Sequence, residues 1–436
     1  MNLTKLSTQT FLFNVAGFMS RVILGVLVAR ILSPTDKGLL TLIILYPSIF
    51  FILGHFNLGL STIHCLGKKE YKKEEFAGNL LFFSAVVSLA LLLIFFISYL
   101  LGEDYLYKNF PSKFLFLSIL VLPFNIFIYY FSSFFQGLGK INWHNIVNLL
   151  AQFMAPFLVL GFWFFGKFTI LEGILVGLIG VSAGSILAWR LVKKEVPEKW
   201  RLNKSLMKNL FSNGAKLQIG TMAAFAVSRA DQFIVGNALP SAELGYYSVA
   251  VSVTELIFLL SVAVETVLYP KTSYQTLEEA QETAARASRI VLWLSIIAGV
   301  GLAILAKFII LLYGGTPYLP AVTPLLILLP GTIFFVIPKI LSTLWIRKGW
   351  FLKLSYIASA MAAFNIITNL ILVPKYGIIG AAFASSLTYF LTFTVVLIIY
   401  FFVVNKKIYK LLIPTKDDFL IFKNLFYQLV KYGSYK

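Results

Sequence analysis

The chain has 436 residues, of which 59% are hydrophobic and only 13% are charged. Soluble globular domains are about 45–50% apolar, so this composition excludes a soluble domain and predicts a polytopic membrane protein. The net charge of +19 at pH 7 does not indicate nucleic-acid binding, because the lysines and arginines occur in short clusters between apolar runs and not along one polar face.

Twelve apolar segments of about 20 residues follow one another, each long enough to cross a hydrocarbon core. The first six lie at roughly 9–32, 39–64, 77–101, 114–136, 144–166 and 170–191. The other six lie at roughly 212–238, 243–268, 288–312, 321–345, 351–373 and 377–404. The first segment is too long for a signal-peptide core, so we expect it to be retained as a span.

Basic residues are concentrated in every second loop. Clusters at 68–73, 193–208 and 347–353 lie on one side in this arrangement, whereas the opposite loops carry few lysines and arginines. Because cytoplasmic loops are enriched in basic residues, we expect both termini to be cytoplasmic in a multi-pass protein of the cell inner (plasma) membrane.

The two halves of the chain repeat one another. Identical residues lie 207 positions apart: Leu32 and Leu239, Gly38 and Gly245, Phe18 and Phe225. Each half has an even number of spans, so the halves share one orientation and are related by a pseudo-two-fold axis along the membrane normal. We therefore predict an all-α polytopic membrane protein with twelve transmembrane helices in two parallel-repeat six-helix lobes around a central cleft.

The domain boundaries follow from the longest charged connection. We place the N-terminal lobe at 1–195, a cytoplasmic linker at 196–209 and the C-terminal lobe at 210–404. Residues 405–436 form a basic tail with apolar residues at helical spacing, and we expect this tail to lie on the inner leaflet as an amphipathic helix.

Several enzymatic signatures are missing from the sequence. There is no Gly-x-x-x-x-Gly-Lys-Ser/Thr loop for nucleotide phosphates, no metal-ligand spacing and no loop with an acidic pair that could act on a sugar bond. The outer loops are too short for a catalytic domain. We expect a transporter and not an enzyme, with no cofactor and no metal site.

Arg21 lies near the middle of the first span. A charge at the bilayer centre costs about 2.5–3.5 kcal/mol on the insertion scale, so its presence indicates a function. Arg21 shares a helical face with Asn14, Gly17 and Gly25, which suits the side of a cavity or close helix packing. We predict that Arg21 and Asn14 bind substrate; the alternative is a structural arginine paired with a neighbouring helix.

The second half offers further candidates for substrate binding. Arg229 lies on the seventh span, one position past the repeat equivalent of Arg21, and shares a face with Gln218. We expect Arg21 and Arg229 to face the same aqueous space. Lys339 follows Pro338, which loosens the tenth span, and both substrate binding and snorkelling to the interface stay open for it.

Two acids in the second half are candidates for binding a coupling ion. Asp231 lies about 200° around the helix from Arg229, so we expect it to meet another helix. A structural pair is an equal alternative for it. Glu255 lies mid-span and needs a partner or a proton. Near the outer turn, we expect Arg30 to pair with Asp36.

Three motifs carry a resemblance over nearly the whole chain. They are Ala29–Gly38 (ARILSPTDKG), Phe135–Lys140 (FQGLGK) and Asn369–Ala382 (NLILVPKYGIIGAA). With twelve spans in two lobes, their order resembles the polysaccharide-transporter branch, which includes the O-antigen flippases, of the multidrug/oligosaccharidyl-lipid/polysaccharide flippase superfamily.

The resemblance implies a flippase that moves undecaprenyl-pyrophosphate-linked oligosaccharide repeat units of O-antigen, capsule or exopolysaccharide from the cytoplasmic to the outer leaflet. Relatives line the cleft between the lobes with cations, here Arg21 and Arg229. We expect alternating access, coupling to a proton or sodium gradient or to the membrane potential, and a monomer. The partners that we expect are membrane lipids, a polysaccharide polymerase and assembly proteins.

Three alternatives remain. A multidrug or organic-cation exporter of the same superfamily needs acidic groups in its cavity, whereas the deep charge of the first half is an arginine. A lipid II flippase is also cationic but typically has additional helices. A sugar polymerase or ligase conflicts with the short outer loops.

Overall fold

The computed structural model describes residues 3–103, 111–166, 168–273, 275–405, 408–415 and 418, and these contain helices and no strand. The helices of the first half are α1 (Leu3–Ile31), α2 (Pro34–Gly54), α3 (Leu58–Lys68), α4 (Lys73–Gly102), α5 (Ser112–Ile119), α6 (Val121–Gly137), α7 (Ile141–Phe164) and α8 (Ile170–Glu195). Those of the second half are α9 (Lys204–Ala238), α10 (Ser241–Thr254), η1 (Glu255–Ile257), α11 (Phe258–Ser273), α12 (Leu277–Ile304), α13 (Ala306–Gly314), η2 (Thr316–Ala321), α14 (Val322–Arg347), α15 (Phe351–Tyr400), η3 (Phe401–Asn405) and α16 (Tyr409–Leu412).

The predicted all-α, polytopic class is confirmed. Within the described residues, ten helical stretches are long and apolar enough to cross a membrane. The ten do not include α9, which carries charges along its length, and they count α15 once because its helix continues to Tyr400 past the kink at Gly377. The arrangement of twelve spans in two six-helix lobes stays a prediction.

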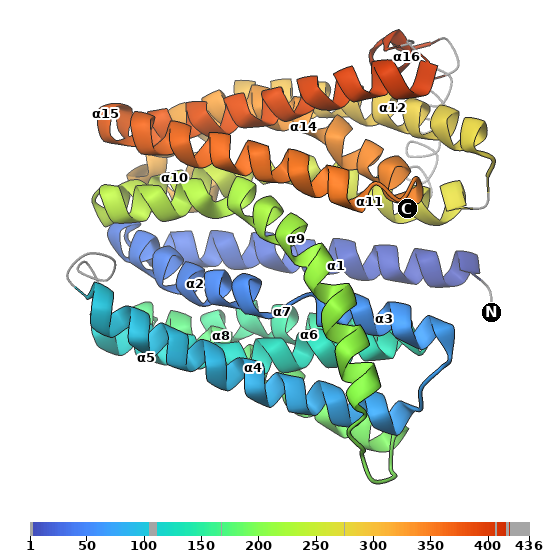
Figure 1. The fold of residues 1–436 in the computed structure, drawn as a ribbon. Helices are drawn as coiled ribbons and strands as arrows, with labels where there is room; N and C mark the ends of the chain where they lie inside the picture. Colours follow the sequence, from blue (N-terminus) through green and yellow to red (C-terminus); the bar gives the residue numbers. More distant parts are fainter. Residues whose placement is uncertain are drawn as a thin grey trace, which may run out of the picture.

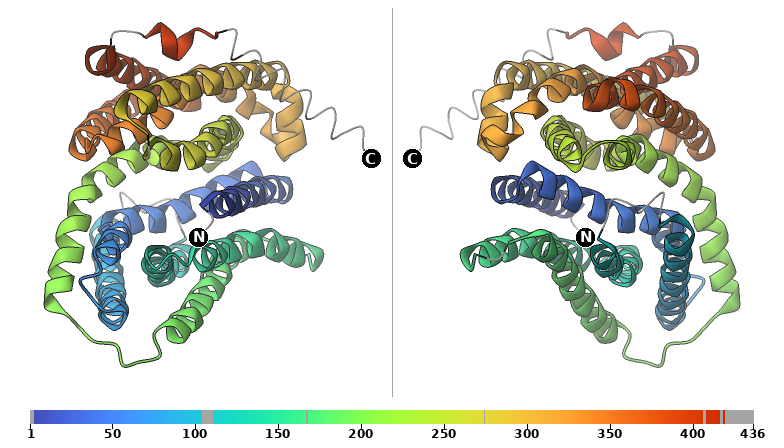
Figure 2. Two further views of the ribbon diagram at one scale, coloured as in Figure 1. Left: turned by 90° about the vertical axis from the view of Figure 1, so that its right-hand side faces the viewer. Right: turned by 90° about the vertical axis from the view of Figure 1, so that its left-hand side faces the viewer.

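The helices gather into two groups (Figures 1 and 2). Helices α1 to α8 lie together, and α10 to α16 form the second group. Helix α9 runs obliquely from the first group into the second, so that its beginning lies beside α3 and its end beside α15. The domain boundaries that we set at 195 and 209 remain predictions.

Some predicted spans are broken helices. The second span breaks between α2 and α3, where Phe56 and Asn57 both adopt φ of 48°. The carbonyl groups freed by this break receive hydrogen bonds from outside their own helix. Gln218 of α9 donates to the carbonyl oxygens of Ile52 and Leu53, and Tyr130 of α6 donates to that of His55. These bonds satisfy backbone groups that would be costly to leave unpaired in a membrane.

The two groups meet through a reciprocal contact between α2 and α10. A Cβ on Gly38 would collide with the carbonyl oxygen of Ser241, and a Cβ on Gly245 would collide with that of Pro34. Residues 34 and 241 are themselves 207 positions apart, as Gly38 and Gly245 are. The same contact is therefore made twice in opposite directions, which is the property of a two-fold interface.

Side chains fasten the same end of the molecule. The Arg30 guanidinium of α1 donates to the carbonyl oxygens of Leu311 (2.7 Å) and Leu312 (2.6 and 3.0 Å) at the end of α13. The Tyr318 hydroxyl donates to the carbonyl oxygen of Leu32 at 3.1 Å. The expected pair between Arg30 and Asp36 is wrong, because the unpaired carbonyls at a helix C-terminus also attract a cation and lie within reach.

The described part of the tail docks on α12. Asp418 accepts hydrogen bonds from Arg289 at 2.5 and 3.0 Å, and Trp293 donates to the carbonyl oxygen of Leu412. Of the tail 405–436 that we predicted as an amphipathic helix, α16 covers only Tyr409–Leu412, and 413–415 are not helical. Residues 406–407, 416–417 and 419–436 lie outside the described residues, so the predicted helix there stays a prediction.

Candidate functional site

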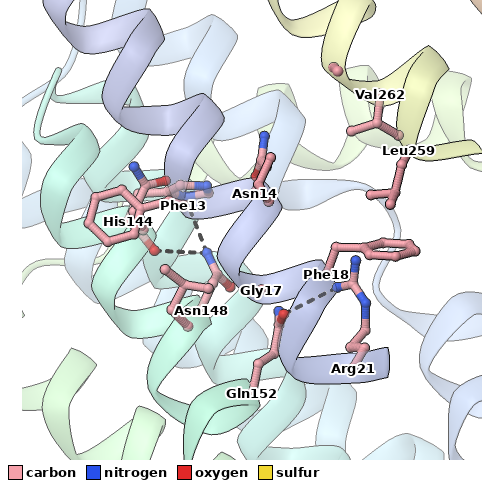
Figure 3. A pocket seen from close by; sticks show the side chains of 14 residues that line it. Phe13, Asn14, Gly17, Phe18, Arg21, His144, Asn148, Gln152, Leu259 and Val262 are labelled. Carbon is pink, nitrogen blue, oxygen red and sulfur yellow. Dashed lines mark hydrogen bonds between the residues drawn. The ribbon is translucent and has the colours of Figure 1, made fainter. Parts of the chain in front are cut away.

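A cavity of about 350 Å³ lies between α1, α7 and α11 (Figure 3). The polar and charged lining residues all come from α1 and α7 of the first half, whereas the lining residues from α11 of the second half are apolar. The residues are Phe13, Asn14, Val15, Gly17, Phe18 and Arg21 of α1; His144, Asn145, Asn148, Leu149 and Gln152 of α7; and Leu259, Val262 and Ala263 of α11. Because the two halves of the chain contribute opposite sides, a relative movement of the halves would change its shape.

Helix α1 brings two predicted substrate-binding residues, Asn14 and Arg21, to this cavity. The face predicted from their spacing is the one that lines it. The Arg21 side chain is exposed, donates to the Gln152 side-chain oxygen at 3.1 Å and lies with its guanidinium carbon 5.6 Å from the centre of the Phe18 ring. Among the described residues Arg21 forms no ion pair, so its charge is available to an anion.

The position of α7 beside α1 has a cause in the sequence. Pro156 lacks the N–H that would bond the carbonyl oxygen of Gln152 within the helix. The Ser20 hydroxyl of α1 donates to this freed oxygen at 2.7 Å. Gly17 allows the approach, because a Cβ there would lie 2.8 Å from the Gln152 side-chain oxygen. Gln152 is thus held where its amide meets Arg21.

Helix α7 adds a polar strip that our sequence reasoning missed. His144, Asn148 and Gln152 follow one another at intervals of four residues and therefore share one face, with Asn145 beside them. We define these four residues as the α7 strip. A spacing of four among polar residues in an apolar span was the signal available in the sequence.

Arg229 forms an ion pair with Glu255. Its guanidinium donates to both carboxylate oxygens of Glu255, at 2.8 and 3.3 Å, and both side chains are about one-third exposed. Glu255 lies one turn before Leu259 of the cavity lining. The ion pair is thus close to the cavity, although neither member is among the described lining residues.

Asp231 meets other helices, as predicted. It is buried and accepts hydrogen bonds from Tyr247 (2.6 Å), Ser385 (2.8 Å) and the backbone of Gln232 (2.7 Å). No ion pair reaches it from the described residues.

Two predicted substrate-binding residues lie elsewhere. Gln218 is buried against the break between α2 and α3, where it bonds Asn57 at 3.1 Å as well as the backbone. The Lys339 ammonium lies 4.7 Å from the centre of the Phe258 ring, a cation–π contact. Neither residue lines the described cavity, so their predicted substrate contacts gain no support from it.

The sequence matches a family model. Residues 27–323 match the family described as "Polysaccharide biosynthesis protein". An uncharacterized membrane protein of Methanocaldococcus jannaschii is 28% identical over 220 residues, which are 48% of this chain and 42% of that relative's length. The chain thus matches less than half of the length of this curated relative.

Solved structures show the same fold. A structure titled as the lipid II flippase MurJ in an inward closed conformation aligns with a TM-score of 0.70 and 19% identity, covering 89% of this chain and 87% of its own. An inward-facing multidrug resistance MATE transporter of the MOP superfamily has a TM-score of 0.70 at 13% identity, covering 87% of this chain and 92% of its own. An outward-facing structure of a MATE transporter aligns with a TM-score of 0.63 at 13% identity, with coverages of 90% and 92%.

Proposed function

Since the chain belongs to the polysaccharide biosynthesis protein family, we propose that it is a flippase that moves a polyprenyl-diphosphate-linked saccharide across the membrane. One observation carries this proposal. Arg21 is an exposed cation in a cavity inside a membrane protein, and no carboxylate among the described residues lies within ion-pair distance of it. A charge in that position is costly unless an anion uses it.

The chemistry of a diphosphate suits this site. At an effective dielectric constant near 20, a charge pair about 4 Å apart contributes about 4 kcal/mol before desolvation. Arginine also binds phosphate oxygens through two parallel hydrogen bonds. A second cation would come from Arg229 when Glu255 releases it. The polyprenyl chain would stay in the lipid while the charged head occupies the cavity.

The two halves are in contact at one end of the molecule, and the cavity lies toward the other end, which is the arrangement expected of one state in alternating access. From Gly25 onwards α1 packs against the second half, because a Cβ on Gly25 would collide with the Tyr313 hydroxyl of α13. Arg30 and the Gly38–Gly245 contact close the same end. The cavity lies on the other side of Arg21, toward the N-terminus of α1. With the predicted cytoplasmic termini, this end accepts substrate from the cytoplasmic leaflet.

We also propose that Asp231 binds the coupling ion, a proton or sodium. Glu255 already has an ion-pair partner, whereas the groups that bond Asp231 are the hydroxyls of Tyr247 and Ser385 and the backbone amide of Gln232. Substitution of Asp231 by Asn should make transport in proteoliposomes independent of the imposed gradient. Retention of the wild-type dependence in the Asp231→Asn protein would rule out this role.

The flippase proposal is tested by replacing Arg21. Proteoliposomes that contain lipid-linked saccharide from the host membranes are assayed for the fraction that reaches the opposite leaflet. Loss of one charged hydrogen-bonding group costs about 1.5–3 kcal/mol, so Arg21→Gln should slow transport by about 10- to 100-fold. Arg21→Lys should retain part of the rate, and Met19→Gln, at a neighbouring exposed position, serves as the control.

Two results would count against the proposal. If Arg21→Gln transports at the wild-type rate, Arg21 does not bind the head group. If the wild-type protein moves no lipid-linked saccharide but protects cells against lipophilic cations, the chain is a multidrug exporter.

A further inference from the structure

We propose that the α7 strip (His144, Asn145, Asn148 and Gln152) is the saccharide subsite of the cavity, with Arg21 at its phosphate end. The inference rests on the proposed function and adds to it which residues recognise the sugar. It concerns the hydroxyl groups of the sugar unit nearest the diphosphate.

The residue types match sugar chemistry. A hydroxyl both donates and accepts hydrogen bonds, and so does a side-chain amide. A carboxylate could only accept, and a lysine could only donate. Three of the four strip residues are amides, and the described lining residues include no carboxylate and no lysine. This composition suits a neutral, hydroxyl-rich ligand better than an organic cation.

The strip has unused hydrogen-bonding groups. Asn145 is 5% exposed and lines the cavity, and its side-chain amide nitrogen has no hydrogen-bond partner within the described chain. His144 Nδ1 lies 3.0 Å from the carbonyl oxygen of Ser132, which can only accept. Nδ1 therefore carries the proton, and Nε2 remains as an acceptor. A buried, unpaired amide is costly, so we expect the Asn145 side chain to turn toward a ligand hydroxyl when the cavity is filled.

The geometry also orders the two subsites. Each interval of four residues advances about 6 Å along a helix, so the strip extends about 12 Å from Gln152 to His144. Gln152 contacts Arg21 directly, whereas Asn148 donates to the backbone oxygen of His144 at 2.9 Å, further from Arg21 (Figure 3). A saccharide that begins at a phosphate held by Arg21 would run along α7. The apolar side chains of Leu259 and Val262 face it from α11 and suit the C–H faces of sugar rings.

The test compares two lipids on the full chain in nanodiscs by native mass spectrometry. One is undecaprenyl diphosphate, and the other is the lipid-linked saccharide purified from the host membranes. Asn148→Leu should weaken binding of the saccharide lipid by about three- to tenfold, the value of one lost hydrogen bond, and leave undecaprenyl diphosphate binding unchanged. Arg21→Gln should weaken both.

Two controls keep the test specific. Asn148→Gln retains an amide and should keep most of the preference, and Phe153→Leu changes an exposed residue of α7 and should change neither affinity. The inference is overturned if Asn148→Leu binds the saccharide lipid as the wild type does, or if it weakens both lipids equally. If Arg21→Gln instead binds both lipids normally, the phosphate site of the proposed function fails. The ratio of the two lipid affinities in Asn148→Leu still tests the role of the α7 strip.

Discussion

The ion pair between Arg229 and Glu255 places two opposite charges beside a cavity within the membrane. Replacing one member leaves the other uncompensated, so Glu255→Gln should lower the free energy of unfolding. Because both side chains are about one-third exposed, we expect a loss of about 1–3 kcal/mol, less than for a fully buried pair. Thermal unfolding in detergent measures the change.

The double variant Arg229→Gln/Glu255→Gln gives the control for this pair. It removes both charges, and it should recover much of the stability that the single variant loses. A Glu255→Gln protein that melts as the wild type does but no longer responds to an ion gradient would contradict a structural pair. Glu255 would then be a coupling residue.

At the residue scale, the sequence predicted the first-half site in part. Arg21 and Asn14 stood out because polar residues are costly in an apolar span, and both line the cavity. The α7 strip did not stand out, because asparagine and histidine in a membrane helix often only satisfy nearby backbone groups. The freed carbonyl at Gln152 and its bond to Ser20 join positions 132 residues apart, and a single helix pattern does not contain such information.

At the scale of elements, the docking of the tail on α12 depends on Asp418. Burial alone would raise the pKa of this carboxyl, but hydrogen bonds from Arg289 and Thr415 outweigh it and lower the pKa from 3.8 to about 2. A lowered folded-state pKa stabilises the docked tail above the unfolded value and loses this effect as pH falls toward 2. Docking should therefore be constant between pH 5 and 8.

Removing this carboxylate tests the role of the tail. Asp418→Asn should cost about 2 kcal/mol of docking free energy, because the hydrogen bonds from Arg289 then no longer end on a charged carboxylate. Hydrogen exchange of the backbone at 409–413 should become faster at pH 7. The control Glu278→Gln removes an exposed carboxylate from α12, the helix on which the tail docks. Equal exchange in Asp418→Asn and the wild type would show that the tail is held by other contacts.

The helical elements were predictable, and their breaks were not. Apolar length located nearly all the long helices, since about 20 apolar residues are needed to cross a membrane. The break at Phe56 and Asn57 depends on Gln218, a side chain more than 160 positions away that satisfies the freed carbonyls. Without such a partner an unbroken helix would be favoured in lipid.

At the scale of the whole molecule, the Gly38–Gly245 contact controls how tightly the closed end is held. In Gly38→Ala the new Cβ collides with the carbonyl oxygen of Ser241. Overpacking of this kind costs about 1–3 kcal/mol, which would raise the population with this end open by roughly 5- to 150-fold. Hydrogen exchange at 34–40 and 241–247 should become faster in both segments.

A matched glycine elsewhere serves as the control. Gly161 of α7 has no heavy atom within 4 Å of the position that a Cβ would occupy, so Gly161→Ala should leave exchange at 34–40 and 241–247 unchanged. Slower or unchanged exchange at both segments in Gly38→Ala would mean that the two halves do not separate at this contact.

The reciprocity of this contact also bears on how the chain arose. Pro34 meets Gly245 as Ser241 meets Gly38, which is how two copies of one polypeptide pair around a shared axis. We infer an ancestor of half this length that associated as a homodimer, in which every substitution at the contact changed both sides at once. Fusion of the two copies would end that constraint and let each half change on its own, as Arg21 without a carboxylate partner and Arg229 paired with Glu255 illustrate among the described residues.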